Sequence, residues 1–189
     1  MFVAGFVGFS GSGKTTLIEY LLREFAARGL RCSVIKHAHH GFELDRQGKD
    51  SWRHRKAGAH EVLVASPHLL ALQRETQEPR EYELGDLLRR LDAVDWVFVE
   101  GFRNAPIPKI EVWRADAGKP LALPEDPRVL ALATDAPPPS WRPGARQAGA
   151  ADETGAAPDS RPRVLLDLQR PGSIADWLME NRQLFVSGQ

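Results

Sequence analysis

Four residues near the N-terminus have the types and spacing of a phosphate-binding loop. In the stretch "GFSGSGKTT", Gly8, Gly13, Lys14 and Thr15 fit the pattern G-x-x-x-x-G-K-[ST]. Glycines leave backbone N–H groups open to a phosphate, the lysine offers a positive charge to its oxygens, and the threonine hydroxyl can bind Mg²⁺. We therefore predict that this loop, here called the P-loop (residues 8–15), and the residue after it bind nucleotide phosphates through Gly11, Ser12, Gly13, Lys14, Thr15 and Thr16.

The segments on both sides of the P-loop are those that such a loop needs. Residues 2–7 form an almost continuous apolar run, which is typical of a buried parallel strand. Residues 14–28 repeat apolar side chains at helical spacing, and Gly29 follows as a helix-ending signal. A second apolar segment, residues 30–37, then predicts another strand. This βαβ order makes a glycine-rich turn without a ligand the weaker interpretation.

A carboxylate is expected beside the P-loop, and Glu100 is the candidate. It ends the apolar segment "DWVFVEG", whereas Asp95 lies at the opposite end of the same strand. Ligands of open α/β sheets collect beyond the carboxyl ends of the strands, so Glu100 should lie near the phosphates. It can hold Mg²⁺ through a water or orient an attacking water; a purely structural bond to loop amides is the alternative.

The segment from residue 36 to residue 59 is rich in histidine and basic residues. Three interpretations remain open: a solvated charged loop, a zinc or iron site, and an anion-binding loop. We favour the third, since cysteines and a standard metal-ligand spacing are missing. In it, Asp45 or Asp50 helps to bind Mg²⁺, and the anion or substrate is bound by Lys36, His37, His39, His40 and Lys49.

The rest of the chain predicts a single α/β domain over residues 1–189, a three-layer αβα fold of the P-loop NTPase type with a mostly parallel sheet. Residues 60–66 and 68–74 predict a hairpin, and residues 172–182 predict a closing helix with Ser173 as its N-cap. Residues 136–163 are rich in Pro, Ala and Gly, which is typical of a flexible insertion. We expect its removal to leave nucleotide binding intact.

Charge and cysteine content limit the function classes. The 25 Lys and Arg balance the 25 Asp and Glu, which argues against a general nucleic-acid-binding protein. The single cysteine, Cys32, cannot form an internal disulfide, which suits a reducing cytoplasm. The apolar start of the chain is far too short to cross a bilayer, so neither nucleic acid nor a membrane is an expected partner.

Four segments together resemble one known family. "GFSGSGKTTLIEYLL", "VIKHAHHGFELDRQGKDSWRHRKAGA", "VFVEGFRNAPIPKIEVWR" and "LALATD" look like the molybdopterin-guanine dinucleotide biosynthesis protein B family. The resemblance implies a homodimeric GTP-binding protein of molybdenum-cofactor maturation that hydrolyses GTP slowly. It also implies a guanylyltransferase partner that joins GMP to molybdopterin, with the pterin as a further ligand. By the same resemblance Gly11 to Thr16 bind phosphates, and Asp45 and Glu100 lie near the metal. From the P-loop pattern we also expect Thr15 at the metal, and we expect Lys14, Glu100 and Asp45 to act in any hydrolysis.

Two further residues are candidates on chemical grounds. Asp135 ends the apolar segment "RVLALATD", where its carboxylate can accept hydrogen bonds from guanine N1–H and the 2-amino group. The Asn and Lys of the usual NKxD signature are missing before it, so a capping or turn role stays open. Arg103, after "EGF", is a candidate phosphate ligand, with a solvated loop arginine as the alternative.

Two other functions remain possible from the sequence. The P-loop also looks like that of adenylylsulfate kinases, which favours a small-molecule kinase that uses ATP. Lys36 and His37 stand where many such kinases place a carboxylate base, which argues against this function. The second is a binding module without turnover, in which the nucleotide only stabilises a complex.

Overall fold

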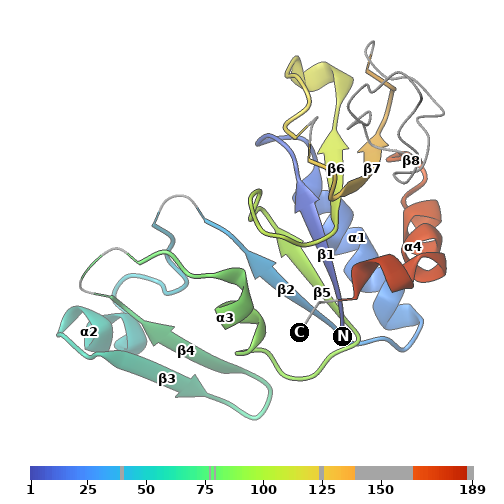
Figure 1. Ribbon diagram of the computed structural model, residues 1–189. Helices are drawn as coiled ribbons and strands as arrows, with labels where there is room; N and C mark the ends of the chain where they lie inside the picture. Colours follow the sequence, from blue (N-terminus) through green and yellow to red (C-terminus); the bar gives the residue numbers. More distant parts are fainter. Residues whose placement is uncertain (39–40, 77, 79, 124–125, 139–163, 187–189) are drawn as a thin grey trace. The chain divides into compact units, whose positions relative to one another are not determined.

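The computed structural model describes residues 1–38, 41–76, 78, 80–123, 126–138 and 164–186. The chain forms two compact units (Figure 1). Unit 1 contains residues 1–37 and 87–189, and unit 2 contains residues 38–86. The predicted insertion at residues 136–163 lies almost wholly outside the described residues.

Unit 1 is built on a parallel sheet of six strands in the order β2-β5-β1-β6-β7-β8. Every neighbouring pair in it is parallel, so all the strands end at one edge. The prediction of an α/β fold with a mostly parallel sheet is confirmed. The strands are β1 (Phe2–Val7), β2 (Cys32–Lys36), β5 (Trp96–Glu100), β6 (Lys109–Trp113), β7 (Val129–Thr134) and β8 (Val164–Asp167).

Two helices bury their apolar faces in the core on one side of this sheet. They are α1 (Lys14–Ala27) and α4 (Pro171–Glu180), and the short 3₁₀ helix η2 (Arg182–Phe185) follows. Phe25 of α1 meets the rings of Trp96 and Phe98 edge to face, with centroids 5.5 and 5.3 Å apart. The N-cap prediction for α4 is wrong: Arg170 is the N-cap, Pro171 begins the helix, and the Ser173 hydroxyl donates to the Arg170 carbonyl.

The opposite face of the sheet carries a buried ionic layer. The side chains of Lys109 and Glu111 lie on this face and are almost completely buried. Lys109 Nζ lies 2.8 Å from a carboxylate oxygen of Asp126. Glu111 accepts hydrogen bonds from the backbone N–H groups of Ala122 and Leu123. These bonds fasten the segment that follows β6 to the sheet, next to the loop that leaves β1.

Unit 2 contains a helix and an antiparallel hairpin. The hairpin pairs β3 (Glu61–Ala65) with β4 (Leu70–Arg74), as the sequence predicts. Helix α2 (Asp50–Lys56) was not predicted, because its seven residues bury none of their side chains and show no apolar periodicity. The chain leaves unit 2 within α3 (Leu84–Leu88). None of the described helices has the length and hydropathy needed to span a membrane.

Candidate nucleotide-binding site

The P-loop connects β1 to α1 in a conformation that requires its glycines. Gly8 has φ of 140°, and a Cβ there would lie 2.3 Å from the carbonyl oxygen of Val112. Gly13, with φ of 93°, is the N-cap of α1. Ser12 is buried, and within the described part of the chain its hydroxyl has no hydrogen-bond partner. The loop therefore presents a helix N-terminus and an unused polar atom, both of which suit a phosphate.

Lys14 folds back over the loop that precedes it. Its Nζ donates to the carbonyl oxygens of Gly8 and Phe9, at 3.1 and 2.8 Å. Burial lowers the pKa of Lys14; the nearby Glu100 carboxylate opposes this shift, while Lys36 and Arg103 add to it. Several cations thus converge on one point, which is the electrostatic setting that a polyphosphate requires.

Glu100 meets Thr15 and Lys36 at the edge where β5 ends. The Thr15 hydroxyl lies 3.0 and 3.2 Å from the two carboxylate oxygens of Glu100, and Lys36 Nζ lies 3.1 Å from one of them. A hydroxyl and a carboxylate side by side are hard oxygen ligands of the kind that Mg²⁺ prefers, so the donor set fits this ion. As the sequence predicts, these three residues lie together at the edge of the sheet where the strands end.

Asp135 is held by a residue that the sequence analysis did not select. Arg114 Nη1 lies 3.1 Å from one oxygen of Asp135, and the N–H of Ala115 lies 3.4 Å from the other. The Arg114 guanidinium also lies against the P-loop, since a Cβ on Gly13 would come within 3.1 Å of its Nε. Only the sheet order reveals this contact, because β6 and β1 are neighbours that lie about a hundred residues apart in the sequence.

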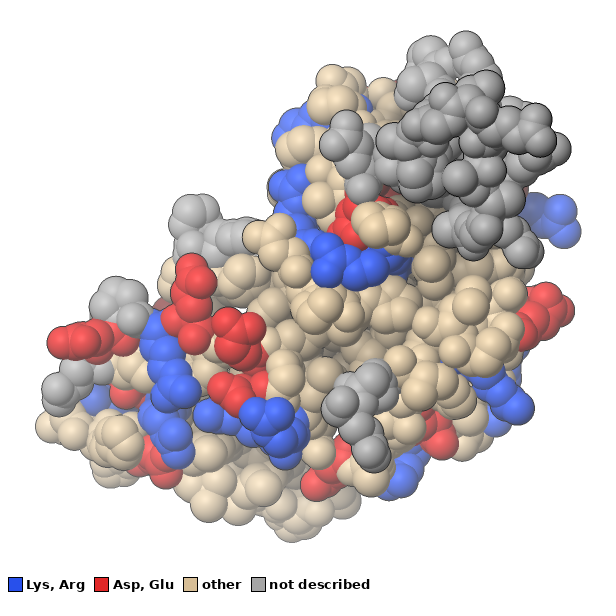
Figure 2. All heavy atoms as spheres, viewed as in Figure 1, with Lys and Arg blue, Asp and Glu red and all other residues tan. Residues whose placement is uncertain are grey.

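Arg103 and His37 lie at the border of the site, and each contacts other residues of the protein. Arg103 Nη2 donates to the Ala122 carbonyl at 2.6 Å, and its guanidinium lies 5.6 Å from the centre of the Phe9 ring. Lys119 Nζ lies 5.3 Å from the same ring. The His37 ring stacks on Phe102 with centroids 4.7 Å apart. Over the face in Figure 2, basic and acidic side chains are interspersed.

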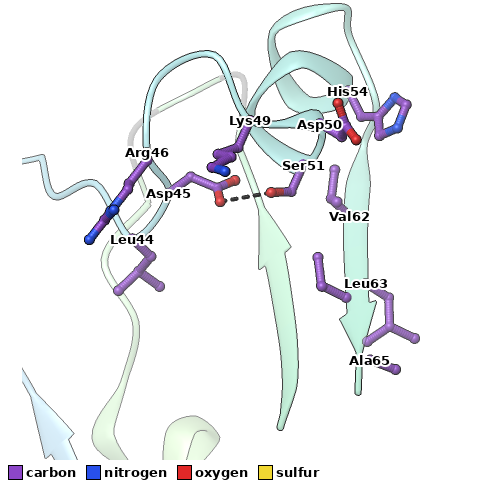
Figure 3. A pocket seen from close by; sticks show the side chains of 11 residues that line it. Leu44, Asp45, Arg46, Lys49, Asp50, Ser51, His54, Val62, Leu63 and Ala65 are labelled. Atoms are coloured by element: carbon purple, nitrogen blue, oxygen red, sulfur yellow. Dashed lines mark hydrogen bonds between the residues drawn. The ribbon is translucent and has the colours of Figure 1, made fainter.

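Asp45 and Lys49 belong to unit 2, where they line an open hollow between the start of α2 and β3 (Figure 3). Asp45 Oδ1 accepts a hydrogen bond from the Ser51 hydroxyl at 2.8 Å, while Asp45 Oδ2 is buried and has no partner among the described residues. His39 and His40 lie outside the described residues. Across the part of the chain that the structure describes, no three His, Cys, Asp or Glu side chains gather to hold a metal.

Comparison with known proteins identifies the family. The family model of molybdopterin guanine dinucleotide synthesis protein B matches residues 3–135. The chain belongs to this family. The resemblance seen in the sequence is thereby confirmed, and the match includes the P-loop, Glu100, Arg114 and Asp135.

Named members of this family are similar to this chain over most of their length. The molybdopterin-guanine dinucleotide biosynthesis adapter protein of Haemophilus influenzae is 48% identical over 136 residues, which are 70% of this chain and 74% of that protein. The Escherichia coli adapter protein is 44% identical over 135 residues, 70% of this chain and 77% of that protein.

Solved structures of the same family share the fold. Bacillus subtilis MobB superposes with a TM-score of 0.63 at 23% identity, covering 100% of both chains. The MobB homologue from Bacillus stearothermophilus gives 0.59 at 22% identity, covering 97% of this chain and 99% of that one. These likenesses confirm the α/β fold with its mostly parallel sheet.

Proposed function

We propose that this protein is a GTP-binding adapter of molybdopterin guanine dinucleotide biosynthesis, with Mg²⁺ as the cofactor of GTP. The observation that carries the proposal is the meeting of Lys14, Thr15 and Glu100 at the N-terminus of α1. Family membership and the adapter names of its relatives support the pathway. The guanylyltransferase of that pathway is the proposed partner, and molybdopterin is a proposed further ligand.

Each residue of the site has a defined task in this proposal. The backbone N–H groups of residues 11–16 bind the β-phosphate, and Lys14 exchanges its bonds to the Gly8 and Phe9 carbonyls for bonds to phosphate oxygens. Thr15 and Glu100 would hold Mg²⁺, which would neutralise charge on the phosphates. Lys36, released from Glu100, lies at the same edge and can bind the terminal phosphate.

Hydrolysis, where it occurs, follows from the same geometry and is expected to be slow. Water attacks the γ-phosphate in line with the bond that breaks, and Lys14 stabilises the charge that develops on the phosphate oxygens. Glu100 is the carboxylate in place to orient that water. Asp45 and Lys49 remain proposed metal and phosphate ligands, as do His37, His39 and His40 for the anion.

A homodimer and a cytoplasmic location complete the proposal. The hairpin of unit 2 leaves several large apolar side chains more than half exposed, which supports contact with a second copy: Leu63, Leu69, Leu70 and Leu72. Light scattering on the purified protein would measure the mass of the assembly. A monomer at micromolar concentration would contradict this part of the proposal without affecting nucleotide binding.

Titration calorimetry with GTP and ATP, in Mg²⁺ and after chelation, tests the central claim. We expect GTP to bind more tightly than ATP, and Mg²⁺ to strengthen binding. Lys14→Ala should abolish binding, because it removes the charge that faces the phosphates. Arg23→Ala on the same helix is the matched control, since this residue is outside the P-loop. Preference for ATP would favour a small-molecule kinase, and unchanged affinity in Lys14→Ala would refute the phosphate assignment.

A further inference from the structure

The sheet order fixes the direction in which a bound nucleotide must extend. The residues suited to Mg²⁺ and the terminal phosphate, Thr15, Glu100 and Lys36, lie on the side of β1 that carries β5 and β2. The other side of the P-loop, where β6 and β7 end, is then the side left for the ribose and base. The candidates for base recognition are the residues that follow these two strands.

Arg114 joins the first of these segments to the P-loop. Its guanidinium lies against Gly13, at the N-terminus of α1, and is anchored by Asp135 at the end of β7. One carboxylate oxygen of Asp135 thus accepts a hydrogen bond from Arg114, and the other accepts from the N–H of Ala115. With both oxygens engaged inside the protein, this carboxylate is a support for Arg114 rather than a free acceptor for a base.

Asp116 follows two residues after Arg114 and is free to bind a ligand. It lies in the short 3₁₀ helix η1 (Ala115–Ala117), its side chain is exposed, and within the described residues it has no hydrogen-bond or ion-pair partner. The turn around it is braced: Trp113 Nε1 donates to the Lys119 carbonyl at 2.7 Å, and the N–H of Gly118 donates to the Ala115 carbonyl at 3.1 Å. Asp116 thus offers an exposed carboxylate on a turn held by these two bonds, two residues from the arginine that contacts the P-loop.

We propose that Asp116 is the carboxylate that selects guanine, and that Arg114, fixed by Asp135, positions its turn against the P-loop. This inference rests on the proposed GTP binding and adds its specificity determinant. The two oxygens of a carboxylate match the N1–H and 2-amino donors of guanine, whereas adenine offers no such pair. The sequence "WRAD" at residues 113–116 also has its cation and its acid at the second and fourth places, as NKxD does.

An exchange of donor and acceptor at this position tests the inference. In xanthine a carbonyl replaces the 2-amino group, so the amide of Asp116→Asn can accept from N1–H and donate to that carbonyl. We expect this variant to lose at least about tenfold in GTP affinity and to gain affinity for XTP, as measured by calorimetry. The matched variant Asp135→Asn should weaken GTP and XTP together and keep the wild-type preference.

The outcomes separate this inference from the proposed function. Wild-type protein without preference for GTP over ATP would refute the proposed function itself. Wild-type preference for GTP together with an unchanged GTP-to-XTP ratio in Asp116→Asn would overturn only the assignment of Asp116. A switch toward XTP in Asp135→Asn would show that Asp135, and not Asp116, recognises guanine. Because Asp116 is exposed, thermal unfolding of its variant without nucleotide should match the wild type, which verifies the fold.

Discussion

Loss of the Asp126 carboxylate should destabilise unit 1 more than loss of its lysine partner. Lys109 is fully buried and has Asp126 as its ion-pair partner, at 2.8 Å. Asp126 is in contact with a second cation, because Arg128 donates to it from Nε at 2.7 Å and from its backbone N–H at 3.0 Å. Removal of Asp126 therefore leaves Lys109 without its ion-pair partner, whereas removal of Lys109 leaves Asp126 bonded to Arg128.

The magnitudes follow from what remains after each substitution. Asp126→Ala leaves a buried ammonium without its acceptor, for which the expected cost is about 3–5 kcal/mol. Lys109→Met keeps the buried stem and leaves Asp126 bonded to Arg128, so the expected cost is one charge-assisted hydrogen bond, about 1.5–3 kcal/mol. The double variant should be more stable than Asp126→Ala alone, since it no longer buries a charge.

Urea unfolding of the three variants and the wild type at pH 7 measures these free energies. A pH series adds an independent check. Burial lowers the pKa of Lys109, and the hydrogen bond and charge of Asp126 oppose this shift. Without Asp126 the folded pKa falls further below the unfolded one, so the cost of Asp126→Ala should shrink as the pH rises toward 10. A cost for Lys109→Met equal to that of Asp126→Ala would refute this reasoning.

Three other predictions follow from the site and the sheet. Glu100→Gln should reduce GTP hydrolysis far more than GTP binding, and equal losses in single-turnover and calorimetric assays would make Glu100 structural. Gly8→Ala should destabilise the fold by more than about 2 kcal/mol in urea unfolding, because its Cβ would strike a carbonyl oxygen, whereas Gly11→Ala, with open space around it, should lose only about 1 kcal/mol. Burial, with a contribution from Asp95, raises the pKa of Cys32 to about 11, so iodoacetamide should label it much more slowly in native protein than in urea at pH 8, and equal rates would show an accessible thiolate.

The local parts of the site could be predicted because neighbouring residues in the sequence determine them. The strand before the P-loop, the helix after it and the end of β5 follow from apolar periodicity, and Glu100 does meet Thr15. The hairpin of unit 2 follows from two short apolar segments around a turn. These are features in which local propensity and tertiary packing agree.

The contacts of Arg114 with Asp135 and the P-loop could not be predicted because they depend on the order of the strands. Nothing local indicates that β6 pairs with β1 or that β5 lies between β1 and β2. The sequence analysis therefore selected Asp135 at the end of β7 without the residue that contacts it, Arg114. Likewise, nothing local in the sequence indicates that the charges of Lys109 and Glu111 are buried against a segment more than ten residues away.

The contacts of Lys14 have a consequence for the kinetics of nucleotide exchange. Because Nζ holds the carbonyls of Gly8 and Phe9, contacts within the protein itself keep the loop in the shape of a cradle. Little chain entropy is then lost on binding, and association should be fast and similar for all triphosphates. Selection among the triphosphates should therefore come from differences in their dissociation rates, which stopped-flow experiments can measure.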